Sequence, residues 1–345
     1  MMVSMAFALF SAAADHHPRP LPHCGGDGLA ECPNFLFIVS DDLRPQIDAV
    51  GFDFPQVHTP HLRALSERAL SFTRAYVQQA LCGPSRNSFL SGRRPDSTMS
   101  WNFIDSFRTA PGAARWKSLP QWFREAGWNT LGAGKIFHPG LPQTKAGAPW
   151  DYPYSWDNLV ANITEQEHRN GSLVNRTYTG YEWLYPSEKR CPGNTSWCAI
   201  DPAADAANAD FEDGQITNAT LPLLRAAAAN RSASGRPWFV AAGFRKPHLQ
   251  WKFPAAFLNA SFPPPDPNCP TDAECLAASI PLPKHRRYPP DAPLVGFHQP
   301  NDDFNLAFDD TVACGGASMG PFWNFNDTCT RQFRRAYVCS LLVTY

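Results

Sequence analysis

Three short apolar segments, each followed closely by polar residues, constrain the fold of this chain more than any other feature. Phe35–Val39 runs into the pair Asp41-Asp42, a second segment lies within residues 128–137, and a third, residues 237–243, is followed by the sequence FRKPH. Short continuous apolar runs are typical of strands buried on both faces of a parallel sheet. Ligands bind at the carboxyl ends of such strands. We therefore predict an α/β domain with a mainly parallel central sheet flanked by helices, and a functional site at the strand ends.

Helix signals lie between the predicted strands, as this fold class requires. Thr59 and Pro60 have the pattern of an N-cap followed by a first-turn proline. Apolar residues then recur on one helical face, at Leu62, Leu65 and Ala69. A second helix is predicted after Ser118, which could form a capping box with Gln121. Its apolar anchors and its C-terminal stop are predicted at Trp122, Phe123 and Gly127.

Size and charge exclude some classes of protein. With 345 residues, of which 43% are apolar, the chain can bury a large core. The formal net charge of -1 argues against a protein that binds nucleic acid or another polyanion through bulk electrostatics. No apolar run approaches the ~20 residues that a membrane span needs.

The N-terminal segment and the sequons indicate the secretory pathway. Residues 3–14 (VSMAFALFSAAA) resemble a signal peptide, which we predict over residues 1–14. Several Asn-x-Ser/Thr sequons are candidate glycosylation sites. They are Asn162, Asn170, Asn175, Asn194, Asn218, Asn230, Asn259 and Asn326. We expect an extracellular or lysosomal location.

The ten cysteines leave two without a nearby partner. Candidate local disulfides are Cys24–Cys32, Cys191–Cys198, Cys269–Cys275 and Cys314–Cys329. Spacing alone does not prove this connectivity. Cys339 lies in an apolar helical pattern and is expected to be a buried thiol, whereas Cys82 directly precedes Gly-Pro-Ser-Arg. A leftover cysteine in an oxidising compartment is buried, paired with another chain or chemically special.

Four blocks of sequence carry a family resemblance. In order, they are FLFIVSDDLRP, TPHLRALSERALSFTRAYVQQALCGPSRNSFLSGRRPD, GAGKIFHPG and FVAAGFRKPH. Together they resemble the N-terminal region of the sulfatases, in the alkaline phosphatase superfamily, and are closest to the iduronate-2-sulfatase branch. The likeness is dense between about residues 34 and 140 and resumes around residues 220–250.

The resemblance implies a domain organisation. Residues 15–33 would be an N-terminal linker, and residues 34–345 would be the N-terminal portion of a sulfatase catalytic domain. Residues 139–202 and 261–302 are rich in proline or glycine and match the family least. We predict that both are long surface insertions.

In sulfatases the cysteine of this motif is oxidised to formylglycine during secretion. The resemblance therefore implies the same fate for Cys82, with a formylglycine-generating enzyme as a maturation partner. The hydrated aldehyde is a geminal diol, so one hydroxyl can attack sulfur and release the substrate alcohol. Deprotonation of the second hydroxyl then expels sulfate and restores the aldehyde. The implied activity is hydrolysis of sulfate esters on a sulfated carbohydrate.

The resemblance also assigns roles to the residues around this motif. Asp41 and Asp42, together with the modified Cys82, would bind Ca²⁺, and Arg86 would steady the modified residue. Adjacent strand residues point to opposite faces, so the chain must bend at the aspartate pair. Three further residues would contact sulfate oxygens or transfer protons. They are Lys135, His138 and His248.

Each of these residues also has an ordinary structural explanation when taken alone. An aspartate pair after a strand is commonly a turn or a helix cap. A single histidine is more often structural, and Cys82 could be one more buried thiol. The order and spacing of all the motifs together favour the site.

The C-terminal side departs from the family pattern, since no later strand with an Asp-His pair and no further lysine block follow. The chain ends in RQFRRAYVCSLLVTY, which we expect to be a truncated helix, with an incomplete calcium site as the consequence.

Three hypotheses about function stay open. The chain is an incomplete calcium-dependent sulfatase, a catalytically inactive glycoprotein that binds sulfated glycans, or a phosphoryl hydrolase with another nucleophile. The substrate stays open between a 2-sulfated uronic acid and another sulfated polysaccharide.

Overall fold

The protein is described by a computed structural model that falls into two compact units, each built from separated parts of the chain. The first unit comprises residues 1–45, 74–187 and 212–245, and the second comprises residues 46–73, 188–211 and 246–345. Within these limits the structure describes residues 6–8, 26–52, 54, 57–103, 105–138, 151, 154–157, 163–169, 172–178, 190–259, 275, 279–282, 314 and 326–342.

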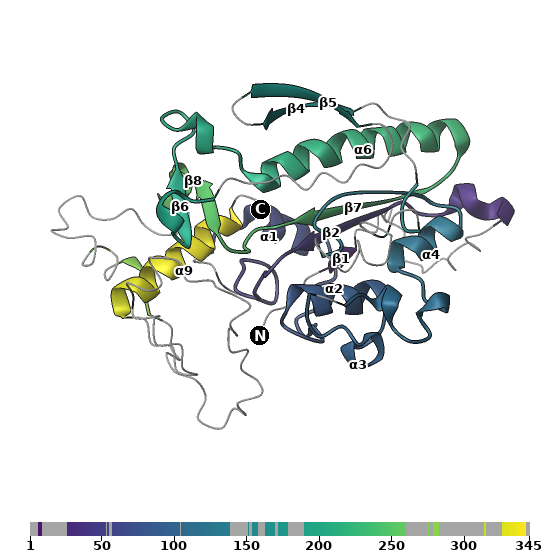
Figure 1. Cartoon of the computed structure of the whole chain (residues 1–345), viewed down its shortest axis with the longest axis horizontal. Coiled ribbons are helices and arrows are strands. Elements are labelled where there is room, and N and C mark those ends of the chain that lie inside the picture. The colour runs from purple at the N-terminus through teal and green to yellow at the C-terminus, as the bar shows by residue number, and fades with distance from the viewer. Residues whose placement is uncertain are drawn as a thin grey trace. The chain divides into compact units, whose positions relative to one another are not determined.

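The first unit is organised around a sheet whose strand order is β1-β2-β7-β3 (Figure 1). The strands are β1 Ala6–Ala8, β2 Phe35–Ser40, β3 Asn129–Gly134 and β7 Trp238–Phe244. β7 is central and pairs in parallel with both β2 and β3, whereas β1 pairs with β2 in antiparallel fashion. The three predicted strands and the mainly parallel sheet are therefore confirmed. The short strand β1 lies within the segment for which a signal peptide is predicted.

Helices cover both faces of this sheet (Figure 1). They are α2 Cys82–Ser91, α3 Pro95–Thr98, α4 Leu119–Glu125 and α6 Glu212–Ser234. Successive strand residues point to opposite faces, and β7 is apolar on both of them. Val240 packs in one core cluster with Leu223 and Ala227 of α6, whereas Phe239 packs in another with Leu90 of α2. This double burial explains why the strand is a continuous apolar run.

The predicted start of α4 is confirmed at atomic detail. The Ser118 hydroxyl accepts a hydrogen bond from the Gln121 amide at 3.2 Å, and Gly127 follows the helix with φ +105°. Phe123 stacks on Phe239 in the core, as expected of an apolar anchor. Trp122 does not, because its ring is 59% exposed and lies beneath the Lys117 ammonium.

The longest helix, α6, was not predicted from the sequence. It contains Pro222, a residue that normally argues against a helix interior, and its polar residues obscure the apolar stripe that packs on the sheet. Its role is nevertheless central, since it packs against β3 and β7 on one face of the sheet.

The other elements of the first unit are short. A β-hairpin is formed by β4 Ile163–Arg169 and β5 Ser172–Tyr178, which pair antiparallel. The 3₁₀ helices are η1 Gly26–Glu31, η2 Phe107–Thr109 and η3 Ala113–Arg115. Of the insertion predicted over residues 139–202, the structure describes this hairpin together with residues 151, 154–157 and 190–202.

The second unit contains a smaller parallel pair of strands. Its elements are α1 Pro60–Ser66, η5 Pro192–Asn194, β6 Trp197–Ile200, η6 Ala206–Asn208, β8 Trp251–Pro254, η7 Ala255–Asn259 and α9 Asp327–Leu341. β6 pairs with β8, and α9 packs against them through a cluster that includes Phe253, Ala336 and Cys339. The predicted helix after residue 60 is present but ends at Ser66, so Ala69 lies beyond it. Thr59 supports this helix by exchanging two hydrogen bonds with the Asp48 backbone rather than by capping its amides.

The cysteines follow the predicted pattern wherever both partners are described. Cys191–Cys198 and Cys314–Cys329 are disulfides. Cys32 and Cys275 are also disulfide-bonded, and the partners predicted for them, Cys24 and Cys269, lie outside the described residues. Cys82 and Cys339 are free thiols, and Cys339 is buried as expected.

Several predictions concern surface segments. Four candidate glycosylation sites, Asn194, Asn218, Asn230 and Asn326, are exposed, which is the first requirement for modification. Asn162, Asn170 and most of the insertion over residues 261–302 lie outside the described residues, and the side chains of Asn175 and Asn259 are not described. None of the helices in the described part of the chain has the length and hydropathy needed to cross a membrane.

Candidate active site

Cys82 is placed by the start of α2, of which it is the first residue. Leu81 before it is extended, and the helix then tolerates Pro84 because the first-turn amides have no intrahelical acceptor. The helix ends at Gly92 in the left-handed conformation, φ +67°. The free thiol is therefore held, partly exposed, at the N-terminus of a ten-residue helix, where the helix dipole favours negative charge.

Asp41 lies at the carboxyl end of β2 and shares its carboxylate between two buried cations. Arg86 donates to its Oδ1 at 2.9 Å, and the Lys135 ammonium donates to its Oδ2. All three residues are almost fully buried. A buried ion pair stabilises a fold only when every charge has a partner. The charges of Asp41, Arg86 and Lys135 therefore depend on one another.

Arg86 also ties α2 to the end of β3. Its guanidinium donates to the carbonyl of Ile136 at 3.0 Å and to the carbonyl of Lys135. Its Nε is buried and has no hydrogen-bond partner among the described residues. A planar group with donors in a fixed fork suits this bridging position, which a lysine would fill only in part.

Asp42 bends the chain directly after the strand. Its backbone has φ +59°, in the left-handed region, which is the bend that the sequence predicted at the aspartate pair. Burial, and then the neighbouring Asp41 carboxylate, raise the pKa of Asp42 from 3.8 to about 7, although Lys135, Arg86 and Arg245 act in the opposite direction. A second buried negative charge is therefore poorly compensated by the protein alone.

The carboxyl ends of β3 and β7 approach each other unusually closely. A Cβ atom on Gly243 would lie 2.3 Å from the Lys135 carbonyl oxygen, and one on Gly134 would lie 2.2 Å from the Gly243 oxygen. Glycine at both positions therefore lets the backbone of Lys135 pass beside β7. This approach brings the Lys135 side chain to Asp41.

His138 reaches the same region through an aromatic neighbour. Its ring stacks on Phe103 with centroids 4.5 Å apart. Phe103 in turn lies against the start of α2, because a Cβ on Gly83 would come within 2.8 Å of the phenyl ring. The first unit thus brings together six of the seven predicted residues: Asp41, Asp42, Cys82, Arg86, Lys135 and His138.

The environment of Cys82 disfavours its thiolate. Burial raises the pKa of the Cys82 thiol above 9.0, and the Asp41 and Asp42 carboxylates act in the same direction, against the opposing effect of Lys135 and Arg86. The unmodified side chain is therefore a protonated thiol at neutral pH, and a thiol is a far weaker nucleophile than a thiolate.

The seventh predicted residue, His248, belongs to the second unit, in the turn before β8. Its Nδ1 lies 2.5 Å from the carbonyl oxygen of Leu249. A carbonyl oxygen only accepts, so Nδ1 carries the hydrogen and Nε2 is the nitrogen that exchanges a proton.

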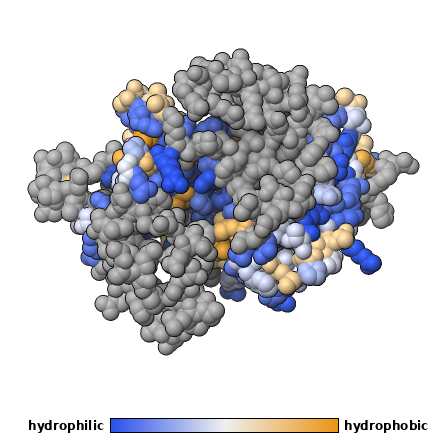
Figure 2. All heavy atoms as spheres, in the orientation of Figure 1, coloured by the Kyte–Doolittle hydropathy of each residue, from blue (hydrophilic) through white to orange (hydrophobic). Residues whose placement is uncertain are grey.

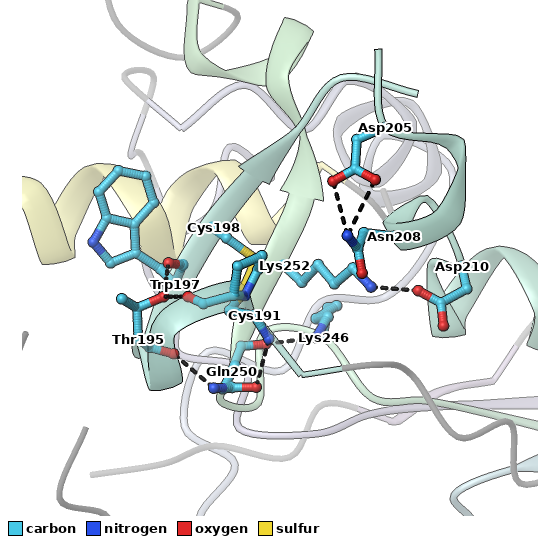
Figure 3. The surroundings of a disulfide bond; sticks show 11 residues. Cys191, Thr195, Trp197, Cys198, Asp205, Asn208, Asp210, Lys246, Gln250 and Lys252 are labelled. Carbon is cyan, nitrogen blue, oxygen red and sulfur yellow. Dashed lines mark hydrogen bonds and ion pairs between the residues drawn. A yellow bond between two sulfur atoms is a disulfide. The ribbon is translucent and has the colours of Figure 1, made fainter. Parts of the chain in front are cut away.

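Gln250 anchors this turn to the Cys191–Cys198 disulfide loop (Figure 3). Its side-chain oxygen accepts from the Cys191 amide at 3.1 Å, and its side-chain nitrogen donates to the Thr195 carbonyl at 2.6 Å. The buried Lys246 ammonium donates to the Gln250 carbonyl at 2.7 Å. The main chain around His248 is thus held from both sides.

A second buried lysine, Lys252, is a residue of β8. Its ammonium forms an ion pair with Asp210, as Figure 3 shows. Sequence reasoning missed Gln250, Lys252 and Phe103, because none belongs to a recognisable motif. For Gln250 and Lys252, the nearby signals in the sequence were the Cys191–Cys198 spacing and the polar residues after β7.

The aspartate pair offers the right atoms for a calcium ion but too few of them. Carboxylate oxygens are hard ligands that suit calcium, and a cation would compensate the second buried carboxylate. Calcium takes six to eight oxygen ligands, however, and no cluster of three or more His, Cys, Asp or Glu residues with metal-site geometry occurs in the described part of the chain. The donors fit calcium in kind, and other ligands must complete the shell.

Comparison with known proteins gives one consistent family. The family model described as Sulfatase matches residues 33–338. The chain is 32% identical over 232 residues to iduronate 2-sulfatase from Mus musculus, which covers 67% of this chain and 38% of the relative. It is 33% identical over 224 residues to iduronate 2-sulfatase from Homo sapiens, covering 65% and 36%. A sulfatase from Formosa agariphila is 28% identical over 241 residues, covering 66% and 41%. The aligned region thus spans about two fifths of the length of these relatives.

Proposed function

Since this chain belongs to the sulfatase family, we propose that its first unit carries the nucleophile and the anion-binding residues of a hydrolase for sulfate esters of sugars. The aligned region spans about two fifths of the relatives' length, so the activity of the whole protein is part of the proposal. The location proposed is the secretory pathway, with an extracellular or lysosomal destination. The disulfides support it, because such bonds persist in oxidising compartments.

One observation carries the proposal: the free Cys82 begins α2, within electrostatic reach of two carboxylates and two cations, and burial raises the pKa of its thiol. A cysteine nucleophile would need the opposite environment, with a lowered pKa. Conversion of Cys82 to formylglycine by a maturation enzyme removes this conflict, because the hydrated aldehyde supplies a hydroxyl nucleophile. The same conflict disfavours an unmodified Cys82 as the nucleophile of a phosphoryl hydrolase.

Two cationic side chains are suited to position the sulfate group. A sulfate ester carries negative charge throughout its hydrolysis, so preorganised cations stabilise the reacting group. Lys135 and Arg86 are held by their ion pairs with Asp41, and the buried Arg86 Nε has no hydrogen-bond partner among the described residues. His138 is held by Phe103 as a further contact for a sulfate oxygen.

His248 is proposed as the group that gives a proton to the leaving oxygen. Since Nδ1 donates to the Leu249 carbonyl, the proton on Nε2 is the one that can be transferred. The residues that would hold calcium are Asp41, Asp42 and the modified Cys82, and a bound calcium ion would polarise the sulfate. Ligands beyond these three would complete its coordination.

The substrate class follows from the relatives rather than from the site alone. Two of them are named iduronate 2-sulfatases, so a 2-sulfated uronic acid is the first candidate. The residues around Cys82 recognise sulfate, which is common to all sulfated polysaccharides, and leave the identity of the sugar to other parts of the molecule.

The decisive experiment is mass spectrometry of the tryptic peptide 75–86 from protein secreted by cells that make formylglycine. We expect the mass of formylglycine or its hydrate at Cys82. Recovery of unmodified cysteine alone would contradict the proposed nucleophile. If the modification is present but a generic aryl sulfate is not hydrolysed, the result favours a protein that binds sulfated glycans without cleaving them.

A matched pair of substitutions tests the same point by activity. Cys82→Ser should abolish sulfate ester hydrolysis, because a serine ester of sulfate cannot expel sulfate by restoring an aldehyde. Cys339→Ala removes the other free thiol, which is buried in the second unit, and should leave the turnover number unchanged. Turnover that persists in Cys82→Ser would identify another nucleophile.

A further inference from the structure

Two residues before Phe103, which lies against the first turn of α2, the chain presents a large aromatic side chain to solvent. We propose that Trp101 is a specificity-determining residue whose indole stacks on the sugar ring that carries the sulfate. This inference rests on the proposed function, since it assigns the part of the substrate that the charged residues do not contact.

The segment that contains Trp101 lies against the start of α2. A Cβ on Gly83 would come within 2.9 Å of the Asn102 carbonyl oxygen and within 2.8 Å of the Phe103 ring. Phe103 stacks on His138, and Gly83 directly follows Cys82 in the helix. Trp101 is therefore two residues from a contact with His138 and adjacent to a residue that touches the first turn of α2.

This segment is held in place by Asn87, one turn further along α2. The buried Asn87 amide donates to the Gly83 carbonyl at 2.9 Å and to the Ser100 hydroxyl at 3.0 Å. Its oxygen accepts from the Phe107 amide at 2.8 Å. The loop is thus fastened on both sides of Trp101 by one side chain.

Two further hydrogen bonds hold the loop around Trp101 itself. The Ser100 hydroxyl donates to the Asp105 carbonyl at 2.9 Å, and Gln79 donates to the Trp101 carbonyl at 3.1 Å. A rigid support of this kind lowers the ordering cost when a ligand binds. The backbone around Trp101 is therefore already ordered, and a ligand that binds there does not have to order it.

The indole of Trp101 is 49% exposed, and the neighbouring Met99 is 45% exposed. Figure 2 shows apolar surface interspersed with hydrophilic surface over the α2–α4 region. Trp122 in the same unit is also exposed, but the Lys117 ammonium covers its ring at 4.6 Å. No cation lies over Trp101 among the residues that the structure describes.

The chemistry of a sulfated sugar matches this arrangement. A pyranose ring has polar hydroxyl edges and a face of C–H groups, and aromatic side chains provide a large apolar area with one polar handle. Ligand sites typically combine apolar and aromatic walls with a few precisely placed polar groups. The buried cations would bind sulfate, and Trp101 would bind the apolar face of the ring.

The test compares two ligands on the secreted full chain by titration calorimetry. Inorganic sulfate has only the group that the cations recognise, whereas the methyl glycoside of a 2-sulfated uronic acid also has the ring. We expect Trp101→Ala to weaken binding of the glycoside by roughly five- to tenfold. Its affinity for inorganic sulfate should change less than about twofold, and Trp101→Phe should retain most of the glycoside affinity.

Trp122→Ala is the matched control, since it also removes an exposed tryptophan from the first unit, and should alter neither affinity. Unchanged glycoside binding in Trp101→Ala, or equal weakening for both ligands, overturns the inference and leaves the proposed function standing. If the wild-type chain binds neither ligand, the proposed function fails, and the inference fails with it.

Discussion

At the scale of single residues, the site depends on how one buried carboxylate is shared. Asp41 is paired with Arg86 and with Lys135, and each of the three would be an uncompensated buried charge without the others. This arrangement explains why two cations can be kept beside a nucleophile in the absence of substrate. It also makes the fold sensitive to the loss of either cation.

We predict that Arg86→Ala lowers the free energy of unfolding by about 3–5 kcal/mol, because it leaves Asp41 buried with one partner fewer and frees two backbone carbonyls. Urea unfolding would measure the change. The control is Arg63→Ala, which breaks exposed pairs with Asp48 and Glu67 and should cost at most about 1 kcal/mol. Equal losses in the two variants would show that the Arg86 pair is not a buried one in solution.

At the scale of secondary structure, glycines at the carboxyl ends of β3 and β7 permit the close approach of the two backbones. We predict that Gly243→Ala destabilises the protein by about 1–3 kcal/mol and displaces Lys135, because the new Cβ would overlap the Lys135 carbonyl. Thermal unfolding and binding of inorganic sulfate would both report the change.

Gly214 provides the matched control for this substitution. It lies in α6, and a Cβ there meets no atom within 4 Å. Gly214→Ala should leave sulfate binding unchanged and raise stability by up to about 1 kcal/mol, from helix propensity. Loss of sulfate binding in both variants would argue against a special role for the close approach of β3 and β7.

The turn that carries His248 depends on the disulfide loop beside it. We predict that Gln250→Ala speeds hydrogen exchange of the Cys191 amide, because this amide loses its acceptor. Gln250→Glu keeps an oxygen at the same place and should preserve the protection of Cys191, while it loses the bond to Thr195. Mass spectrometry or NMR of exchange would measure both variants. Equal protection in wild type and Gln250→Ala would contradict the anchoring role.

At the scale of the whole molecule, four of the candidate glycosylation sites are exposed. We predict glycans at the four exposed sequons, Asn194, Asn218, Asn230 and Asn326, because the modifying enzyme needs access to the side chain. Enzymatic deglycosylation of secreted protein should convert these asparagines to aspartates, which peptide mass spectrometry detects. Unmodified asparagine at all four sites would contradict the prediction.

The parts of the fold that were predicted correctly are those with a local signal. The apolar runs of β2, β3 and β7 reflect burial on both faces, and the start of α4 has a cap that a few neighbouring residues define. The long helix α6 was missed because Pro222 and many polar residues mask its apolar stripe. Trp122 was expected in the core but is exposed, because an apolar residue near a helix start does not by itself define the buried face.

The amino-acid sequence by itself indicated the three strands β2, β3 and β7, the candidate local disulfides, and a cysteine, Cys82, that has no nearby partner and lies beside a recognisable motif. All of these depend on residues close together in the chain. The tertiary structure alone decided that Asp41 lies between Lys135, 94 positions away, and Arg86, 45 positions away. It also placed Asn102 and Phe103 against the start of α2. Such contacts arise only when parallel strands and their crossover helices pack together, because no local periodicity records which distant charges or rings will meet.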